Sequence, residues 1–289
     1  MRKLAVYPHA GTLVGGSTHA AVEMAKFLRT HGWEIVHVFP GPGPGADLAR
    51  EAGFRVQLMG LSERDIVTLR NTNTLPKKVA SILPQLKSTA FTMRWVNAHR
   101  PALVHIHDDR SVFAWGLAAK RAGIPVIWHV HQRSGNALLD RIRLRLVDYV
   151  IYIAEDTKSR FRDYAYLPPG TVIYNPVDTT RFRPPANKAQ VKRALGLPDD
   201  VITIGYVGNF VARKRPEWLI HVVEILCRKG LPVFGVIVGA DLSGGTYSAR
   251  LKQLMESSGY AKRFAFLGYQ PNVERVMQAL DVQIGRAHV

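Results

Sequence analysis

Short apolar runs rich in Val and Ile alternate with longer helical patterns along the whole chain. The runs show little polar alternation, so both faces of each strand are expected to be buried. In the first half they predict strands at residues 4–8, 34–39, 55–59, 103–107, 126–130 and 149–153. Between the first two, Ala21, Met24, Ala25 and Leu28 share one helical face, and Gly32 provides a stop signal. The pattern predicts a parallel sheet covered by helices, which is a doubly wound α/β domain.

The alternation is interrupted between residues 174 and 200, where Asn-Pro, Pro-Pro and Pro-Asp-Asp sequences leave little apolar periodicity. This composition is typical of an interdomain connection. The alternation then resumes, with predicted strands at 201–207, 233–238 and 264–267 and predicted helices at 216–229, 248–258 and 273–280. We therefore expect two tandem domains, at residues 1–173 and 201–289, joined by a connection at residues 174–200.

The composition fits a chain with two packed cores. Its 289 residues are enough for about two domains, and 47% of them are apolar. No apolar run approaches the roughly 18 residues of a membrane span. The single cysteine, Cys227, excludes an internal disulfide and fits a reducing compartment. We therefore expect a cytoplasmic protein.

The formal net charge of +17 calls for an anionic partner, and the most distinct basic segment lies at residues 66–107. This segment contains no Asp or Glu, and its cations are interleaved with large apolar side chains. A basic amphipathic helix of this kind can lie on the anionic inner face of a membrane. A solvated helix face over an ordinary core would show the same pattern, so both interpretations stay open. No recognition motif accompanies the charge, and we expect no nucleic-acid partner.

Two glycine-bearing loops follow predicted strands, one in each domain. Gly15 and Gly16 precede the first helix, where free backbone N–H groups and the helix dipole favour an anion. An ordinary strand-to-helix turn would also use glycine. In the second domain Arg213, Lys214 and Arg215 come just before a helix. Cations there oppose the helix dipole unless they share a bound anion, although they could also be simply solvated.

The order and spacing of several segments resemble those of the retaining family 4 glycosyltransferases. The resemblance rests on the Gly15-Gly16 loop and its helix, and on His105-Ile106-His107-Asp108 after the fourth strand. It continues through residues 125–131, 172–182 and 266–269, and through the helix that ends in Ala279-Leu280-Asp281. It implies the GT-B fold, in which two Rossmann-like doubly wound domains face a cleft.

The resemblance also implies roles for individual residues. Gly15 and Gly16 would place their backbone against the donor diphosphate, and His131 matches an active-site histidine, although a histidine satisfied within the core is the usual alternative. Lys214 matches the lysine that neutralises the leaving diphosphate. Asn209 stands where the family usually has a partner arginine, so the second cation is in doubt. Arg213 or Arg215 could supply it, and the sequence leaves that choice open.

The activity implied is transfer of a hexosyl unit from a nucleotide-diphosphate sugar to a glycan or lipid-linked acceptor, with retention at the anomeric carbon. No cofactor and no metal are expected, and Asp108-Asp109 is interpreted as a loop after a strand. Two alternatives remain. One is a sugar-nucleotide epimerase of the same fold, and the other is a non-enzymatic basic protein that binds membranes or polyanions.

The family pattern stops fitting from about Ile284, before a segment in which the family carries two glutamates that contact the donor. Residues 284–289, Ile-Gly-Arg-Ala-His-Val, are what a short-read sequencing adapter would encode. We therefore expect that these residues are not native and that the second domain is incomplete. On this interpretation the activity belongs to the parent protein, and this chain itself is inactive.

Overall fold

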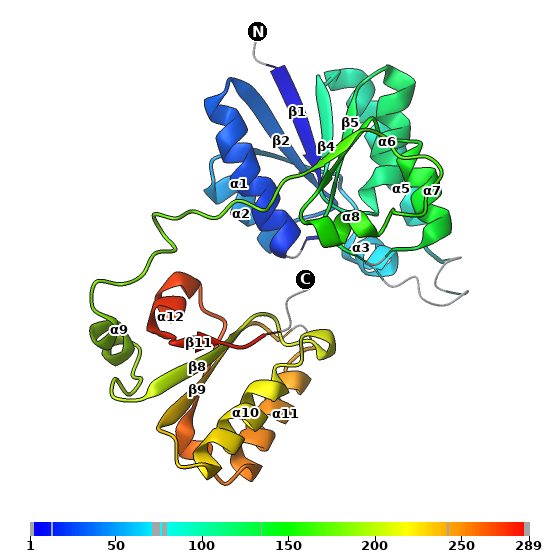
Figure 1. The fold of residues 1–289 in the computed structure, drawn as a ribbon. Helices are drawn as coiled ribbons and strands as arrows, with labels where there is room; N and C mark the ends of the chain where they lie inside the picture. Colours follow the sequence, from blue (N-terminus) through cyan, green and yellow to red (C-terminus); the bar gives the residue numbers. More distant parts are fainter. Residues whose placement is uncertain are drawn as a thin grey trace. The chain divides into compact units, whose positions relative to one another are not determined.

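A computed structural model describes residues 3–12, 14–70, 76, 80–133, 135–241 and 243–285, without the side chains of residues 67–70. The chain divides into two compact units, Met1–Pro176 and Val177–Val289, each of which is an α/β body (Figure 1). The tail at 286–289 lies outside the described residues, as does part of the basic segment, including Lys77 and Lys78.

The first unit contains, among its described residues, a seven-stranded parallel sheet in the order β3-β2-β1-β4-β5-β6-β7. The strand predictions are confirmed to within a residue or so at each end, and the prediction of a doubly wound domain is correct. The short edge strand β7 was not predicted. The strands are β1 Lys3–Pro8, β2 Trp33–Phe39, β3 Arg55–Leu58, β4 Leu103–Ile106, β5 Val126–Val130, β6 Tyr149–Tyr152 and β7 Gly170–Val172.

Helices cover both faces of this sheet (Figure 1). Helices α1 and α2 bury Ala21, Ala25 and Ala49 against one face, and α5 and α6 bury Trp95 and Trp115 against the other. The helices of the unit are α1 Gly16–Thr30, α2 Pro44–Glu51, α3 Glu63–Arg70, α5 Ile82–His99, α6 Ser111–Ala122, α7 Ala137–Leu144 and α8 Glu155–Ser159.

The second unit has a smaller parallel sheet, with four strands among the described residues in the order β10-β9-β8-β11. Helices α10 and α11 pack on one face of it, and α9 and α12 on the other. Helix α9 falls inside the stretch 174–200, where the sequence showed no helical periodicity. The elements are α9 Lys188–Ala194, β8 Ile202–Val207, α10 Glu217–Arg228, β9 Val233–Val238, α11 Thr246–Ser257, β10 Phe264–Gly268, α12 Val273–Ala279 and β11 Val282–Gln283.

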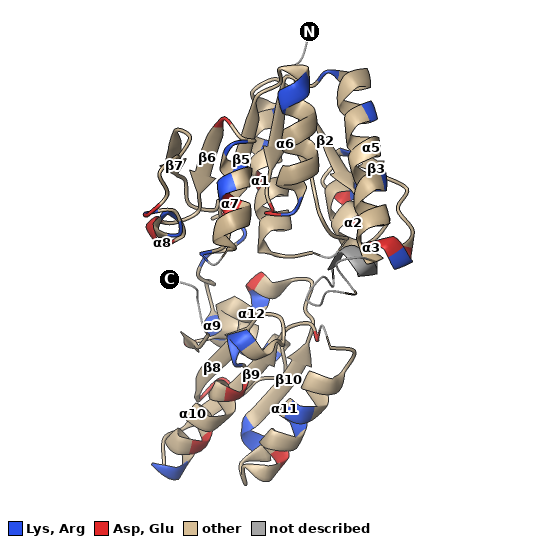
Figure 2. Ribbon diagram, turned by 90° about the vertical axis from the view of Figure 1, so that its right-hand side faces the viewer, with Lys and Arg blue, Asp and Glu red and all other residues tan. Residues whose placement is uncertain are grey.

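Helix α5 carries the described part of the basic segment, and its two halves differ. In the second half Trp95 is buried and Phe91 packs against the core. In the first half Ile82, Leu83 and Leu86 are exposed by 55%, 62% and 61%. Figure 2 shows Lys and Arg along this helix. The second half therefore packs as an amphipathic helix over a core, whereas in the first half these three apolar side chains are exposed among the described residues. None of the described helices is long and apolar enough to cross a membrane.

Candidate active site

The first candidate loop lies at the start of α1. Gly15 is the N-cap, with extended backbone, and Gly16 is the first helical residue. A Cβ atom built on either glycine meets no described atom within 4 Å. The first N–H groups of a helix have no intrahelical acceptor, which favours an anion at this position. The structure gives both residues the setting expected for a diphosphate contact, and the contact itself stays a prediction.

His131 directly follows β5, at the carboxyl end of the strand. Its Nε2 lies 3.2 Å from Nδ1 of His107, which directly follows β4. Burial lowers the pKa of His131 to about 4. Burial and the neighbouring histidines hold the pKa of His107 well below its usual range. Both rings are therefore neutral at neutral pH, and His131 can exchange hydrogen bonds with a substrate but does not supply a positive charge.

Asp108 connects two loops at the same end of the sheet. Its carboxylate accepts hydrogen bonds from the backbone N of Ala10 at 3.0 Å and from the backbone N and Oγ of Ser111 at 2.8 and 2.9 Å. Burial raises the pKa of Asp108, while these hydrogen bonds act in the opposite direction. The side chain thus fixes the loop after β1 against the start of α6.

Arg160, at the end of α8, holds the loop that follows β5. Its guanidinium donates to the carbonyl oxygen of Gln132 at 3.1 Å and to the carboxylates of Asp109 and Asp140 at 2.8 and 2.6 Å. Arg143 also donates to Asp140, at 2.7 Å. The side chains of Arg160 and Asp140 are only 3% and 1% exposed, so each charge depends on its partners. This network was not predicted from the sequence, because its members carry no local motif.

In the second unit a glycine stands at the carboxyl end of each of three neighbouring strands. Gly208 directly follows β8, Gly239 directly follows β9, and Gly268 is the last residue of β10. All three have positive φ angles, which favour glycine. A Cβ atom on Gly239 would lie 1.8 Å from the carbonyl oxygen of Gly208, so no side chain fits there. The N–H of Gly239 donates to the carbonyl of Gly268 at 2.9 Å. The carboxyl ends of these strands therefore form a backbone-lined surface, at the edge where open α/β sheets bind ligands.

Lys214 lies across this surface. It ends the short 3₁₀ turn Ala212–Lys214, and its Nζ is 3.2 Å from the position that a Cβ atom on Gly208 would occupy. Burial and the nearby charge of Arg213 lower the pKa of Lys214. The structure therefore places Lys214, which the sequence singled out, against Gly208, and holds the ammonium group where an anion on the strand ends would meet it.

The other candidate residues near Lys214, which are Asn209, Arg213 and Arg215, make different contacts. The carbonyl oxygen of Asn209 accepts a hydrogen bond from the hydroxyl of Tyr206 at 2.9 Å. The guanidinium of Arg215 lies 5.3 Å from the centre of the Trp218 ring, a cation–π contact. Arg213 is the residue whose charge acts on Lys214. Which of the two arginines replaces the missing cation stays a prediction to be tested.

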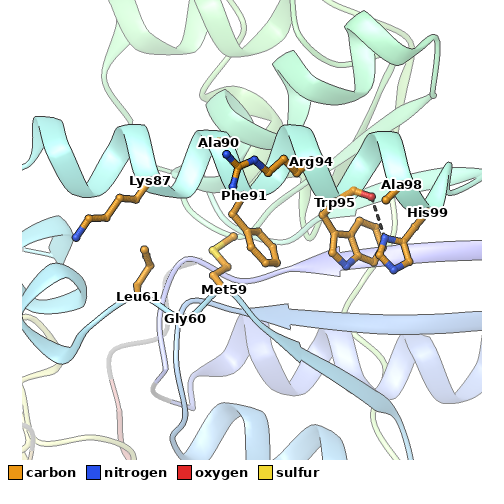
Figure 3. A pocket seen from close by; sticks show the side chains of 10 residues that line it. All are labelled: Met59, Gly60, Leu61, Lys87, Ala90, Phe91, Arg94, Trp95, Ala98 and His99. Atoms are coloured by element: carbon orange, nitrogen blue, oxygen red, sulfur yellow. Dashed lines mark hydrogen bonds between the residues drawn. The ribbon is translucent and has the colours of Figure 1, made fainter.

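Two hollows of the first unit adjoin α5 and share Met59 and Leu61. The first, of about 570 Å³, lies between α5 and the segment after β3. Figure 3 shows Phe91 directed at Met59, with Lys87 and Arg94 also projecting from α5. The second, of about 450 Å³, extends to the carboxyl ends of β1 and β4. Its polar lining includes His9, Gln85, Ser88, Thr89, Arg110, Ser111 and Arg143.

Acid is expected to destabilise the first unit through His37. This buried ring lies 3.0 Å from His9, and burial lowers the pKa of His37 to about 4. The unfolded chain then binds more protons than the folded chain below pH 6.5, so stability present above pH 6.5 is lost towards pH 4. The slope contributed by one such group is about 1.4 kcal/mol per pH unit.

Urea unfolding at pH values from 7.5 to 4.5 measures this slope. The variant His37→Leu should show a shallower loss of stability with falling pH than the natural chain. The same replacement at His31, which is exposed, is the control. An identical slope in His37→Leu and the natural chain would contradict the prediction.

Comparison with known proteins gives the same fold and a family. The family model described as Glycosyltransferase Family 4 matches residues 14–181, and the model described as Glycosyl transferases group 1 matches residues 187–288. The lipopolysaccharide core biosynthesis mannosyltransferase LpsB of Rhizobium meliloti (strain 1021) is 33% identical over 255 residues, which cover 79% of this chain and 67% of the relative. An Escherichia coli UDP-Gal:alpha-D-GlcNAc-diphosphoundecaprenol alpha-1,3-galactosyltransferase is 25% identical over 70% of this chain, which spans only 56% of that relative.

Solved structures show the same architecture at low sequence identity. The Anabaena Alr3699/HepE protein in complex with UDP and glucose superposes with a TM-score of 0.76 at 18% identity, over 97% of this chain and 73% of that one. A glycosyltransferase from Rickettsia africae ESF-5 gives a TM-score of 0.75 at 15% identity, over 98% of this chain and 72% of that one. The fold is therefore GT-B, and with a family model matching more than half of its residues the chain belongs to Glycosyltransferase Family 4.

Proposed function

We propose that the protein transfers a hexosyl unit from a nucleotide-diphosphate sugar to a glycan or lipid-linked acceptor, with retention at the anomeric carbon. The observation that carries the proposal is the position of Lys214, whose ammonium group lies against Gly208 at the carboxyl end of β8. A cation fixed beside exposed backbone is suited to the negative charge that develops on a departing diphosphate.

In the proposed reaction the bond between the anomeric carbon and the diphosphate breaks, and the acceptor hydroxyl attacks from the same face of the sugar. The departing phosphate oxygen takes the acceptor proton, so no carboxylate nucleophile is required. Lys214 and Arg213 stabilise the leaving group, and the N-terminus of α1 at Gly16 supplies N–H donors to the diphosphate. His131 exchanges a hydrogen bond with the transferred sugar as a neutral ring. Neither a metal nor a cofactor takes part.

We place the acceptor in the second hollow of the first unit, which extends to the strand ends next to His9 and Ser111. Its arginine and hydroxyl side chains suit a phosphate- or sugar-bearing group, and the adjoining apolar hollow along α5 suits a lipid chain. The name of the Escherichia coli relative describes an acceptor that carries a diphosphate-linked lipid. A cytoplasmic location fits the use of a nucleotide sugar.

A single substitution at Gly16 separates donor binding from folding. The position is exposed and has room for a side chain, and a carboxylate in the first turn of a helix stabilises it by about 0.3–1 kcal/mol. Gly16→Asp should therefore keep or slightly raise Tm, yet repel the donor diphosphate. In thermal-shift measurements, UDP- or GDP-sugars at about a hundredfold excess over Kd should stabilise the natural chain by about 2.7 kcal/mol and the variant by much less.

The matched control is Gly11→Asp, which adds the same charge at an exposed glycine of the same loop, five positions before the helix begins. It should keep the donor-induced shift. Stabilisation of Gly16→Asp and the natural chain by the same amount would rule out a diphosphate contact at α1. Absence of a shift with every nucleotide sugar in the natural chain would contradict the proposed donor.

We also propose that the first half of α5 lies on the anionic face of a membrane, which would bring the protein to a lipid-linked acceptor. The exposed apolar residues Ile82, Leu83 and Leu86 carry this proposal, together with the absence of acidic residues from 66–107. One neighbouring cation, Lys87, is already paired with Asp65 at 3.1 Å, which weakens the electrostatic part of the attraction.

Cosedimentation with vesicles tests this surface. The natural chain should bind vesicles that contain phosphatidylglycerol more strongly than vesicles of phosphatidylcholine alone. The double variant Leu83→Glu/Leu86→Glu should lose most of this binding, since it replaces apolar contact by repulsion. Ile225→Glu on α10, where the side chain is 52% exposed, is the control. Equal binding of the double variant and the control would exclude α5 as the membrane contact.

A further inference from the structure

Histidines and one tyrosine form a continuous file across the centre of the first sheet. Tyr7 on β1 pairs in register with His37 on β2, and on its other side its ring centre lies 4.9 Å from that of His105 on β4. The ring centre of His107 lies 4.4 Å from that of His105 and 4.9 Å from that of His129 on β5. The three histidines of β4 and β5 are at most 2% exposed, and the proposed reaction uses none of them.

These three buried histidines have ring nitrogens without partners. Nε2 of His105, Nε2 of His107 and both ring nitrogens of His129 make no hydrogen bond in the part of the chain that the structure describes. A buried polar atom left in this way costs about 1–3 kcal/mol, so each one calls for a ligand. Nε2 of His37 and the indole nitrogens of Trp115 and Trp128 also lack a partner among the described residues, but His105, His107 and His129 bring such nitrogens together in one cluster.

The remaining ring nitrogens of two of these histidines are already held. Nδ1 of His105 lies 3.0 Å from the hydroxyl oxygen of Tyr7, and Nδ1 of His107 lies 3.2 Å from Nε2 of His131. When Nδ1–H donates to these partners, the lone pair of each ring is on Nε2, the nitrogen without a partner. Metal-ligating histidines are typically oriented in this way, with the second ring nitrogen bonded to a neighbouring group.

We propose that His105, His107 and His129 bind a divalent transition-metal ion, with zinc as the expected occupant. One nitrogen from each ring lies within 4.8 Å of the other two. Three imidazoles and a water make up a known tetrahedral zinc site. Zn–N bonds of about 2.0–2.1 Å bring such nitrogens to about 3.3 Å from one another, so the rings must close in by about 1.5 Å at most.

The role of the proposed ion is structural. The ion joins β4 to β5 at the end of the sheet from which His131 extends. It also fixes the Nδ1–H of His107 towards Nε2 of His131, so it acts as a positioning element for that residue. The site therefore goes beyond the proposed transfer reaction, which needs no metal.

Metal titration of the untagged 289-residue chain tests the proposal. After treatment with a chelator, Co²⁺ should bind at one equivalent and give the intense visible absorption of a tetrahedral complex. Zn²⁺ should displace it and raise Tm. Tyr7→Phe keeps the buried ring but removes the hydroxyl that orients His105, and should weaken Zn²⁺ binding about 10–100-fold.

Two further variants keep the test decisive. His129→Asn should abolish the Co²⁺ absorption, whereas His221→Asn, at a histidine of α10 whose side chain is 52% exposed, should leave it unchanged. If His129→Asn fails to fold, the spectrum of the natural chain and the affinity of Tyr7→Phe still decide. Absence of a tetrahedral Co²⁺ spectrum in the natural chain, or full Zn²⁺ affinity in Tyr7→Phe, would overturn the proposal. Loss of donor binding in Gly16→Asp has no bearing on it.

Discussion

Replacing Lys214 with alanine is expected to lower the turnover number for sugar transfer by roughly 10²–10³ and to leave the second unit folded. The ammonium group lies against Gly208 and is partly buried, so water does not readily take its place when it is removed. Loss of one preorganised charge beside a developing anion costs about 2.7–4 kcal/mol of transition-state stabilisation. The effect should fall mainly on kcat, because the charge on the diphosphate grows as the bond to the sugar breaks.

Initial rates of radiolabelled sugar transfer measure this effect, and urea unfolding checks the fold. Arg213→Ala should lower kcat as well, since the charge of Arg213 acts at Lys214. Arg215→Ala is the matched control, because this guanidinium is held over the ring of Trp218. An unchanged kcat for Lys214→Ala would remove the basis of the proposed function, and an effect confined to Arg215→Ala would assign the second cation to Arg215.

The central strands could be predicted because burial on both faces leaves a strong signal in the sequence. The runs at Ile202–Val207 and Val233–Val238 contain β-branched residues on both faces, and few other structures accommodate that pattern. The edge strand Gly170–Val172 was missed because it is three residues long and only partly buried. Strands at the edge of a sheet carry less of the apolar pattern on which the prediction relied.

Helix α9 was missed for a different physical reason. Its attachment relies heavily on ion pairs, with Lys188 and Lys192 donating to Asp281 at 2.8 and 2.7 Å. A lysine gives no apolar periodicity, and its partner lies about ninety positions further along the chain. The basic segment is a related case. Trp95 and Leu83 are both large apolar residues of the same basic helix, so the sequence pattern does not distinguish them, yet Trp95 is buried in the core and Leu83 is exposed.

The candidate site was predictable where a local motif marks it. Gly15, Gly16 and Lys214 each lie where a strand leads into a helix, and the structure places the two glycines at the start of α1 and Lys214 in the 3₁₀ turn between β8 and α10. Gly239 was not singled out, because only the packing of adjacent strand ends shows that a side chain there would collide with the carbonyl oxygen of Gly208. Arg160, Asp109 and Asp140, which support the loop after β5, belong to no local motif, because only the folded chain brings them together.

Arg160 is the supporting group with the largest expected effect on folding. Replacing it with methionine keeps the length of the side chain but leaves Arg143 as the described cation that still pairs with the buried carboxylate of Asp140. Breaking a buried ion pair by removing one partner costs about 3–5 kcal/mol. Arg160→Met should therefore lower the free energy of unfolding of the first unit by about that amount, and release the carbonyl of Gln132 from its hydrogen bond.

Urea unfolding should separate this cost from that of an exposed ion pair. Arg50→Met breaks the ion pair between Arg50 and Asp47, whose side chains are 45% and 58% exposed, respectively. It should lower the free energy of unfolding by no more than about 1 kcal/mol. If Arg160→Met lowers the free energy of unfolding no more than Arg50→Met does, the network around Arg160 does not hold the loop after β5. In that case His131 is positioned by its contacts with His107 and His129, and the proposed metal site becomes the element that fixes it.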